Sequence, residues 1–200
     1  MQLVIESATA ACSAALVGPG GELVAERHEL VRRGHAERLG PMIAELLDGR
    51  RPSSILVDCG PGSFTGVRVG IAAAHGLAIG WGIPLSGYSS MAVVAAAAED
   101  GELAVALEGG HGQLFVQSYG REPLAPLDEL RSMTPVDAAA ALTTEAVHGS
   151  GAETLVKARG FGAARDALPR AADARFLPEA LRSLPPRPIY GRAPDARPMS

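Results

Sequence analysis

The sequence has only two cysteines, a single lysine and no excess of positive charge. Cys12 and Cys59 each lie beside apolar residues typical of strands, which favours buried free thiols over a disulfide framework. The 18 basic residues are 17 arginines and Lys157, a bias that we attribute to a GC-rich genome rather than to a binding surface. Residues 1–100 contain 7 basic and 10 acidic side chains, and residues 101–200 contain 11 and 12. Neither half therefore carries the positive charge that sequence-independent binding to a phosphate backbone requires.

Long apolar runs are also absent. The longest extends from Met91 to Ala98, which is far short of the roughly 20 residues that a membrane-spanning helix needs. The N-terminus reaches the acidic Glu6 without the basic and apolar segments of a signal peptide. We therefore expect a soluble, cytoplasmic protein that makes no membrane contact.

The first half of the chain shows an alternating pattern of strands and helices within an ordinary globular composition of 47% hydrophobic and 20% charged residues. Leu39, Ile43 and Leu46 fall at the spacing of an amphipathic helix. The predicted elements are strands at 2–5, 11–17, 22–27, 54–58 and 83–86 and helices at 35–48, 66–80 and 90–99. Pro41 should kink the first helix or mark its first turn. This order predicts a three-layer lobe with a mixed sheet, formed by residues 1–100.

The opening pattern recurs in residues 101–200. Two predicted strands, at 103–107 and 113–119, are separated by a tight turn at 108–112. A helix is expected to begin at Thr134-Pro135, with Thr as the N-terminal cap and Pro at the first helical position. Beyond it the pattern weakens, and we expect an extended tail from Leu184 onward. The second half is therefore predicted to form a reduced copy of the first lobe.

A glycine-rich loop, Gly60-Pro-Gly-Ser-Phe-Thr-Gly66, joins a buried-looking strand to a helix that contains further glycines. Gly70 and Gly76 in the helix interior should together cost about 1–2 kcal/mol relative to alanine. Such a cost indicates that a ligand or a second helix approaches the backbone closely. In an alternative interpretation, Thr65 caps the helix and the glycines only allow tight packing within the protein.

Known phosphate-binding motifs do not fit this loop. A P-loop requires a lysine that the loop lacks, and a dinucleotide-binding motif requires a third glycine where Thr65 stands. Ser63 also lacks the closely flanking glycines of a nucleophile elbow. What remains is a helix N-terminus carrying Ser63 and Thr65, which could receive an anion.

The histidines and carboxylates form no pattern typical of a catalytic or metal site. His35 begins the first predicted helix, but Leu39 stands at i+4, where a second zinc ligand would be needed. Glu6 in the first hairpin could hold a magnesium-phosphate group, although Ala8 occupies a position where close approach favours glycine. We therefore predict no catalytic residue, no metal and no cofactor.

Several of these segments resemble the bacterial TsaB (YeaZ) family. The resemblance is carried by Ile5-Glu-Ser-Ala-Thr9, Ala11-Cys-Ser-Ala-Ala15, His35 to Met42, Gly60 to Gly70, Gly76-Leu-Ala and Pro188-Ile-Tyr-Gly-Arg192. It implies an α/β fold of the actin/Hsp70/sugar-kinase class, in which helices flank the mixed β-sheets of two ribonuclease H-like lobes. Residues from about 120 to 185 show no such resemblance.

The resemblance implies a function in tRNA modification. Family members are partners of TsaD, the catalytic subunit that makes N6-threonylcarbamoyladenosine (t6A) in tRNA, and TsaE, an ATPase, joins the pair. We therefore expect a non-catalytic subunit that stabilises and activates a TsaD-like enzyme, forms a homodimer when alone and meets tRNA only through the complex. TsaD carries two metal-binding histidines on the corresponding helix, of which only His35 is present here. Glu6 stands where the family usually has Asp, which argues against nucleotide binding.

Two other functions are compatible with this fold class. A nucleotide-binding kinase or ATPase of the same superfamily is the main alternative, and it should bind ATP-Mg without a partner. A glycopeptidase, which older names of the relatives suggest, lacks both a metal pair and a nucleophile here.

The glycine-rich helix is the expected partner-binding face. Its small residues would leave a shallow groove for a partner helix, with Arg68 at the rim to bond to the partner. The expected interface residues are Thr65, Gly66, Arg68, Gly70, Ala73, Gly76 and Leu77. The preceding loop, the family signature, consists of Gly60, Pro61, Gly62, Ser63, Phe64, Thr65 and Gly66. If the helical glycines instead pack inside the lobe, large substitutions there would unfold the protein.

Overall fold

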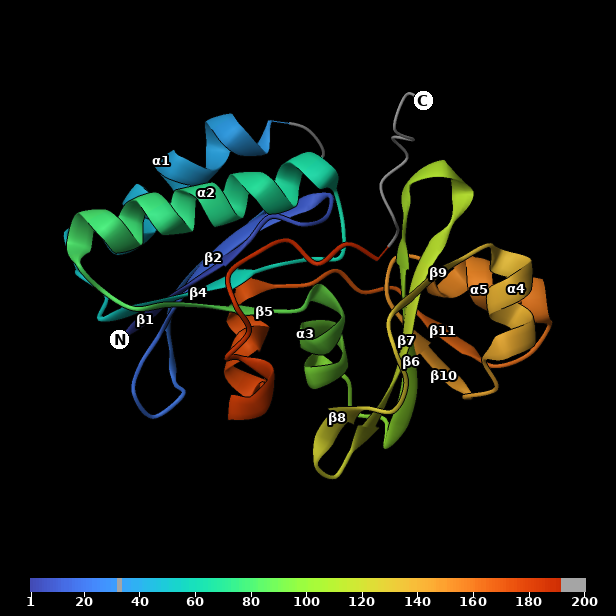
Figure 1. Cartoon of the computed structure of the whole chain (residues 1–200). Coiled ribbons are helices and arrows are strands. Elements are labelled where there is room, and N and C mark those ends of the chain that lie inside the picture. The colour runs from blue at the N-terminus through green and yellow to red at the C-terminus, as the bar shows by residue number, and fades with distance from the viewer. Residues whose placement is uncertain (32–33, 192–200) are drawn as a thin grey trace, which may run out of the picture.

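The computed structural model describes residues 1–31 and 34–191, which form two α/β lobes side by side (Figure 1). The first lobe contains a five-stranded sheet in the order β3–β2–β1–β4–β5. Its strands are β1 (Gln2–Glu6), β2 (Ala11–Val17), β3 (Leu23–Leu30), β4 (Ser54–Asp58) and β5 (Leu85–Tyr88). Strands β1 to β3 form an antiparallel meander, whereas β4 pairs in parallel with both β1 and β5. Strand β1 is therefore central, with the antiparallel strands β2 and β3 on one side and the parallel strands β4 and β5 on the other.

Alternation along β1 divides the core of the first lobe into two layers. The helices on the two faces of the sheet are α1 (His35–Leu47) and α2 (Phe64–Trp81) on one side, and α3 (Ser90–Ala97) and the short helix η2 (Ala171–Phe176) on the other (Figure 1). Leu3 and Ile5 are fully buried against α1 and α2. Val4, on the opposite face, is fully buried against α3 and η2. The period of two along an extended strand accounts for this division.

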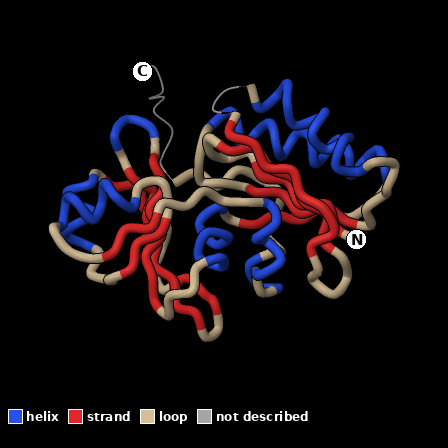
Figure 2. The backbone as a smooth tube through the Cα atoms, turned by 180° about the vertical axis from the view of Figure 1, so that it is seen from behind, coloured by secondary structure: helices blue, strands red, loops and turns tan. Residues whose placement is uncertain are grey.

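The second lobe repeats this topology in a reduced form. Its sheet has the order β11–β10–β6–β7–β8, with β9 also paired to β7. The elements are β6 (Glu102–Glu108), η1 (Gly110–Gly112), β7 (Leu114–Arg121), β8 (Leu124–Pro126), β9 (Arg131–Met133), α4 (Pro135–Ala141), β10 (Ala146–His148), α5 (Ala152–Arg159) and β11 (Ala163–Arg165). The short helix η3 (Glu179–Leu181) follows η2 on the first lobe. Strand β6 has an antiparallel neighbour on one side and a parallel one on the other, as β1 has. Figure 2 shows the layers from behind, with α4 and α5 along the outer side of the second sheet.

This architecture, two lobes with mixed sheets flanked by helices, confirms the predicted fold class. The second lobe is smaller because β8, β9, β10 and β11 each contain only three residues. The predicted division of the chain at residue 100 falls between α3 and β6. As a domain boundary it stays a prediction.

Several boundaries differ from the prediction. The strand predicted at 83–86 begins later, at Leu85, because Ile83 is still hydrogen-bonded to the last turn of α2. Gly82 has a left-handed backbone with φ of 66°, and the amide of Ile83 donates to the carbonyl of Ala78 at 3.1 Å. At the edge of the sheet, β3 continues to Leu30 rather than ending near residue 27.

The predicted start of α4 is confirmed. The hydroxyl of Thr134 accepts a hydrogen bond from the amide of Asp137 at 3.2 Å, and Pro135 occupies the first turn. Pro41 lies inside α1 and beyond its first turn, so it does not mark the first turn, and the kink stays a prediction.

After the second sheet, the chain returns to the first lobe. Leu184 pairs with Gly87 on the edge strand β5 through two backbone hydrogen bonds of 2.7 and 3.0 Å. The amide of Ile189 donates to the carbonyl of Cys59 at 2.7 Å. We call residues 184–190 the tail strap. In Figure 1 this red segment runs from the first sheet to the space between the lobes, so Ile189 lies beside the loop that follows β4.

Candidate functional site

The signature loop, residues 60–66, joins β4 to α2 and packs on the turn between β1 and β2. The amide of Ser63 donates to the carbonyl of Ala8 at 2.6 Å. Ser63 also caps α2, because its hydroxyl accepts a hydrogen bond from the amide of Gly66 at 3.2 Å. The interpretation in which Thr65 caps the helix is therefore wrong, since Thr65 is an exposed residue of the first turn. The N-terminus of α2 is thus capped by a residue two positions earlier than expected.

At two of the predicted interface glycines, the space that a side chain would need is filled by other residues of the same lobe. The hydroxyl of Ser7, in the turn after β1, donates to the carbonyl of Gly66 at 2.9 Å. A Cβ on Gly66 would overlap the carbonyl oxygen of Ser7, and a Cβ on Gly70 would overlap its hydroxyl. The structure therefore corrects the expectation that Gly66 and Gly70 lie in an exposed groove, because both are buried against the β1–β2 turn. This is the alternative that the sequence left open.

The outward side of α2 exposes a different set of residues. Gly76 and Gly80 have open space where a Cβ would stand, and Ile79 between them has 81% of its surface exposed. Of the other predicted interface residues, Thr65 is exposed and three are half-buried, namely Arg68, Ala73 and Leu77. We define the outer face of α2 by five of its exposed residues, Thr65, Ala72, Gly76, Ile79 and Gly80. Sequence reasoning missed Ile79, although it follows Gly76 at the i+3 spacing of one helix face.

Two carboxyl groups are buried beneath the signature loop. Glu6 ends β1 and Asp58 ends the neighbouring parallel strand β4, and they are 0% and 2% exposed. Asp58 accepts hydrogen bonds from the amide of Gly60 at 2.7 Å and from the hydroxyl of Ser90 at 2.8 Å. Glu6 accepts one from the amide of Ala8 at 2.7 Å. Both carboxyl groups therefore lie in a dry, hydrogen-bonded environment.

Burial changes the protonation of this pair. It raises the pKa of Asp58 to about 7, and it raises the pKa of Glu6 well above its usual value, with the charge of Asp58 raising it further. The second oxygen of Glu6, Oε2, has no hydrogen-bond donor beside it. Protonation of Glu6 would remove the repulsion between the two carboxylates, in line with its raised pKa. Sequence reasoning missed Asp58, whose signal in the sequence was an acidic residue at the end of a predicted strand.

His35 is placed as a packing residue. Its Nε2 atom lies 3.1 Å from the carbonyl oxygen of Ala11, and Leu39 at i+4 belongs to the apolar core. Within residues 1–31 and 34–191, no three His, Cys, Asp or Glu side chains are grouped to hold a metal ion. Within the same ranges, no helix is both long enough and apolar enough to cross a membrane.

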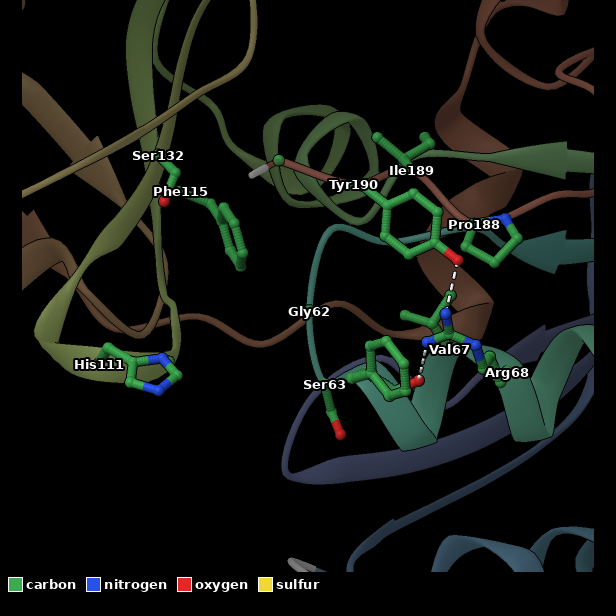
Figure 3. Close-up of a pocket in the computed structure, with 13 residues that line it drawn as sticks. Gly62, Ser63, Val67, Arg68, His111, Phe115, Ser132, Pro188, Ile189 and Tyr190 are labelled. Carbon is green, nitrogen blue, oxygen red and sulfur yellow. Dashed lines mark hydrogen bonds between the residues drawn. The ribbon is translucent and has the colours of Figure 1, made fainter. Parts of the chain in front are cut away.

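A pocket of about 490 Å³ lies between the lobes, beside the signature loop. Figure 3 shows Ser63 and Arg68 on the first-lobe side, His111 and Phe115 on the second-lobe side, and Tyr190 of the tail strap above Arg68. These residues come from segments that are far apart in the sequence. The pocket therefore exists only because the two lobes and the tail strap meet here.

The guanidinium of Arg68 is held between two aromatic rings at this pocket. It lies 3.3 Å from the centroid of the Phe64 ring and 5.3 Å from that of Tyr190. Its Nη1 donates to the carbonyl of Phe64 at 3.0 Å, and its Nη2 donates to the hydroxyl of Tyr190 at 2.6 Å. Cation–π contacts and two hydrogen bonds thus fix the orientation of the positive charge.

The repeated lobes and the space between them define a protein of the actin/Hsp70/sugar-kinase class. A family model for TsaD, tRNA N6-adenosine threonylcarbamoyltransferase, matches residues 25–126. The solved structure of YeaZ from Pseudomonas aeruginosa superposes with a TM-score of 0.80 and 26% identity, over 94% of this chain and 98% of that one. The chain belongs to the TsaB (YeaZ) family.

Curated relatives agree with this assignment. The tRNA threonylcarbamoyladenosine biosynthesis protein TsaB of Escherichia coli is 36% identical over 129 residues, which are 60% of this chain and 55% of TsaB. An uncharacterized protein of Mycobacterium tuberculosis is 30% identical over 99% of this chain and 94% of its own length. The chain spans about half the length of the TsaB relatives that it matches.

Proposed function

We propose that this chain is a non-catalytic subunit of a complex that makes t6A in tRNA, where it binds and activates a TsaD-like catalytic subunit. The relatives named TsaB are described as biosynthesis proteins for tRNA threonylcarbamoyladenosine, and the matching family model carries the name of the transferase. The observation that best supports a binding role is the outer face of α2, where Ile79 is exposed between two open glycines.

The outer face of α2 has the composition of a helix-packing surface. Gly76 and Gly80 would let a partner helix approach more closely than the usual 8–10 Å between helix axes. Burying the side chain of Ile79 in such a contact would contribute about 1.5–3 kcal/mol. The predicted interface residues Ala73 and Leu77 flank this surface and would add to its apolar rim.

The buried carboxyl pair supports a non-catalytic role. Glu6 and Asp58 lie at the carboxyl ends of the neighbouring parallel strands β1 and β4. They are closed off by the signature loop, in which Gly62 packs on Ala8. A buried carboxyl group that holds its proton is a poor ligand for a cation and touches no substrate.

A nucleotide-binding kinase or ATPase is the second candidate, and the pocket between the lobes is the observation that favours it. Among the described residues that line this pocket, none is an Asp or Glu that could hold a magnesium ion. Calorimetric titration of the chain alone with ATP-Mg separates the two functions. We expect no binding, whereas a dissociation constant below about 0.1 mM would favour the kinase or ATPase.

The remaining partner proposals follow from the same surface and from the charge of the chain. We propose that a second copy covers the outer face of α2 when the partner is absent, so that the isolated chain is a homodimer. A TsaE-like ATPase would join the assembled pair. tRNA would be bound through the complex, because both halves of this chain are net acidic.

The central test is co-purification with the TsaD of the same organism, followed by a threonylcarbamoylation assay with and without this chain. Ile79→Arg should weaken partner binding at least tenfold, or about 1.4 kcal/mol, and reduce the stimulation of the assay in parallel. Val136→Arg is the matched control, because Val136 is also an apolar residue on a helix and is 73% exposed, but it lies on the second lobe.

Thermal melting must accompany both variants. The proposal requires that Ile79→Arg melts like the unmodified chain while its binding is lost. Full binding and full stimulation by a folded Ile79→Arg protein would rule out the outer face of α2 as the partner surface.

A further inference from the structure

The pocket between the lobes has the size and construction of a small-molecule site. Its volume of about 490 Å³ lies within the range of roughly 300–1,000 Å³ that is usual for such sites. Its walls come from the start of α2, from the turn and strand around His111 and Phe115, and from the tail strap (Figure 3). A site of this size would accommodate a small organic molecule rather than a single ion.

The lining of the pocket favours one class of ligand. Its apolar part consists of Phe64, Val67, Phe115, Pro188 and Ile189, and its polar side chains are those of Ser63, Arg68, His111, Ser132 and Tyr190. No Asp or Glu is among the described residues of the lining, so a cationic ligand would lack a partner. An apolar body with a negative charge matches these walls, since Arg68 supplies a fixed positive charge.

Arg68 is prepared for such a ligand. A guanidinium has five N–H donors, and the two hydrogen bonds to Phe64 and Tyr190 occupy two of them. Among the described carboxylates, none forms an ion pair with Arg68, whereas Arg38 and Arg170 elsewhere in the protein are each paired with glutamates. The rings of Phe64 and Tyr190 already fix the orientation of the Arg68 side chain. Pairing with an anion therefore costs Arg68 little further side-chain entropy.

We propose that the pocket between the lobes binds a small organic anion with an aromatic or otherwise planar apolar body. The anionic group pairs with Arg68 through a charge-assisted hydrogen bond, and the planar body lies against Phe115 and the tail strap. This site is separate from the outer face of α2 and does not depend on the proposed partner.

The test uses three probes and the isolated chain labelled with nitrogen-15. Indole-3-acetate carries both the ring and the charge, indole-3-acetamide carries the ring alone, and acetate carries the charge alone. We expect saturable shifts of the backbone amides at residues 110–115 and 189–191 with indole-3-acetate. The amide and acetate should each bind at least tenfold more weakly.

Variants locate the charge that is responsible. Arg68→Gln should weaken the binding of indole-3-acetate at least tenfold, and Arg68→Lys should weaken it less, because lysine keeps the charge but loses the planar fork. Arg175→Gln is the matched control, since Arg175 also lies over an aromatic ring, that of Phe176 at 4.5 Å, but outside this pocket. It should bind the probe as the unmodified chain does.

Several outcomes would overturn the proposal. These are equal binding of indole-3-acetate and its amide, unchanged binding by a folded Arg68→Gln variant, shifts confined to other parts of the protein, or a dissociation constant weaker than about 10 mM. If melting shows that Arg68→Gln does not fold, Arg68→Lys and the comparison of carboxylate with amide decide the question. Loss of partner binding by Ile79→Arg has no bearing on these results, so the two proposals fail separately.

Discussion

At the scale of single residues, the glycines of α2 differ in what lies beside them. Gly66 and Gly70 face the backbone and hydroxyl of Ser7, whereas Gly76 and Gly80 face open space. The intrinsic cost of glycine in a helix is the same at all four positions, about 0.5–1 kcal/mol relative to alanine. The surroundings therefore decide whether a methyl group added at each glycine lowers or raises the free energy of unfolding.

A pair of alanine substitutions tests this difference. Gly66→Ala should lower the free energy of unfolding by about 1–3 kcal/mol, because its Cβ would overlap the carbonyl oxygen of Ser7. Gly76→Ala should raise it by about 0.5–1 kcal/mol, because its Cβ meets nothing. Urea denaturation measures both, and effects of the same sign would contradict the packing described here.

The buried carboxyl pair predicts a pH dependence of stability. In the unfolded chain Glu6 and Asp58 ionise near pH 4, whereas burial raises both pKa values in the folded protein, that of Asp58 to about 7. The folded state therefore binds more protons between pH 4 and pH 7. Stability from the pair is fully present below pH 4 and falls as the pH rises through this window, by up to about 1.4 kcal/mol per pH unit for each group that stays protonated.

Glu6→Gln isolates this contribution. The amide keeps the shape and can donate a hydrogen bond to Asp58, but it no longer titrates. Urea denaturation at pH 5, 6, 7 and 8 should therefore give a smaller loss of stability with rising pH for the variant than for the unmodified protein. Tyr88 and Cys59 also face Asp58, and burial raises their pKa values too, that of Cys59 to about 12, so they do not titrate in this range. Equal slopes for the two proteins would show that the pair is not responsible.

At the scale of the element, α2 depends on its cap. Ser63→Ala removes the hydroxyl that accepts from the amide of Gly66, and it should lower the free energy of unfolding by about 1 kcal/mol. Thr65→Ala is the control, because Thr65 is exposed and does not cap the helix, and its effect should be close to zero. Thermal or urea denaturation distinguishes the two, and a larger loss from Thr65→Ala would restore Thr65 as the cap.

Elements with a strong local pattern could be predicted from the sequence. The spacing of Leu39 and Ile43 identified α1, and the pair Thr134-Pro135 identified the start of α4. The carboxyl pair could not be found this way, because Glu6 and Asp58 become neighbours only when β1 pairs with β4. The same limit applies to the glycines of α2, since only the tertiary structure shows which of them face the β1–β2 turn.

At the scale of the whole molecule, the tail strap completes the first lobe. It adds backbone pairing to the exposed edge of β5 at Gly87 and covers the thiol of Cys59, whose Sγ lies 3.7 Å from the carbonyl oxygen of Pro185. It also supplies Tyr190, which holds Arg68 at the pocket between the lobes. One segment of the chain therefore protects a sheet edge, buries a cysteine and forms a wall of the pocket.

Truncation after Ser183 tests the protective role of the tail strap. Without it, Cys59 should react readily with a thiol reagent at pH 8, because its pKa falls from about 12 towards the ordinary value once it is solvated. Cys12 is the internal control, since it is buried in the core between the sheet and α1. Mass spectrometry identifies the modified residue. Equal, slow labelling of both cysteines in the truncated protein would contradict this role.

The position of the tail strap has a consequence for how the protein is made. A ribosome releases β4 and β5 long before it has synthesised residues 184–190, so the nascent first lobe leaves the exit tunnel with an open sheet edge at Gly87 and an uncovered thiol at Cys59. Unpaired strand edges invite association with other chains. During the interval between translation of β5 and translation of the strap, the edge at Gly87 and the thiol of Cys59 are therefore open to association and oxidation.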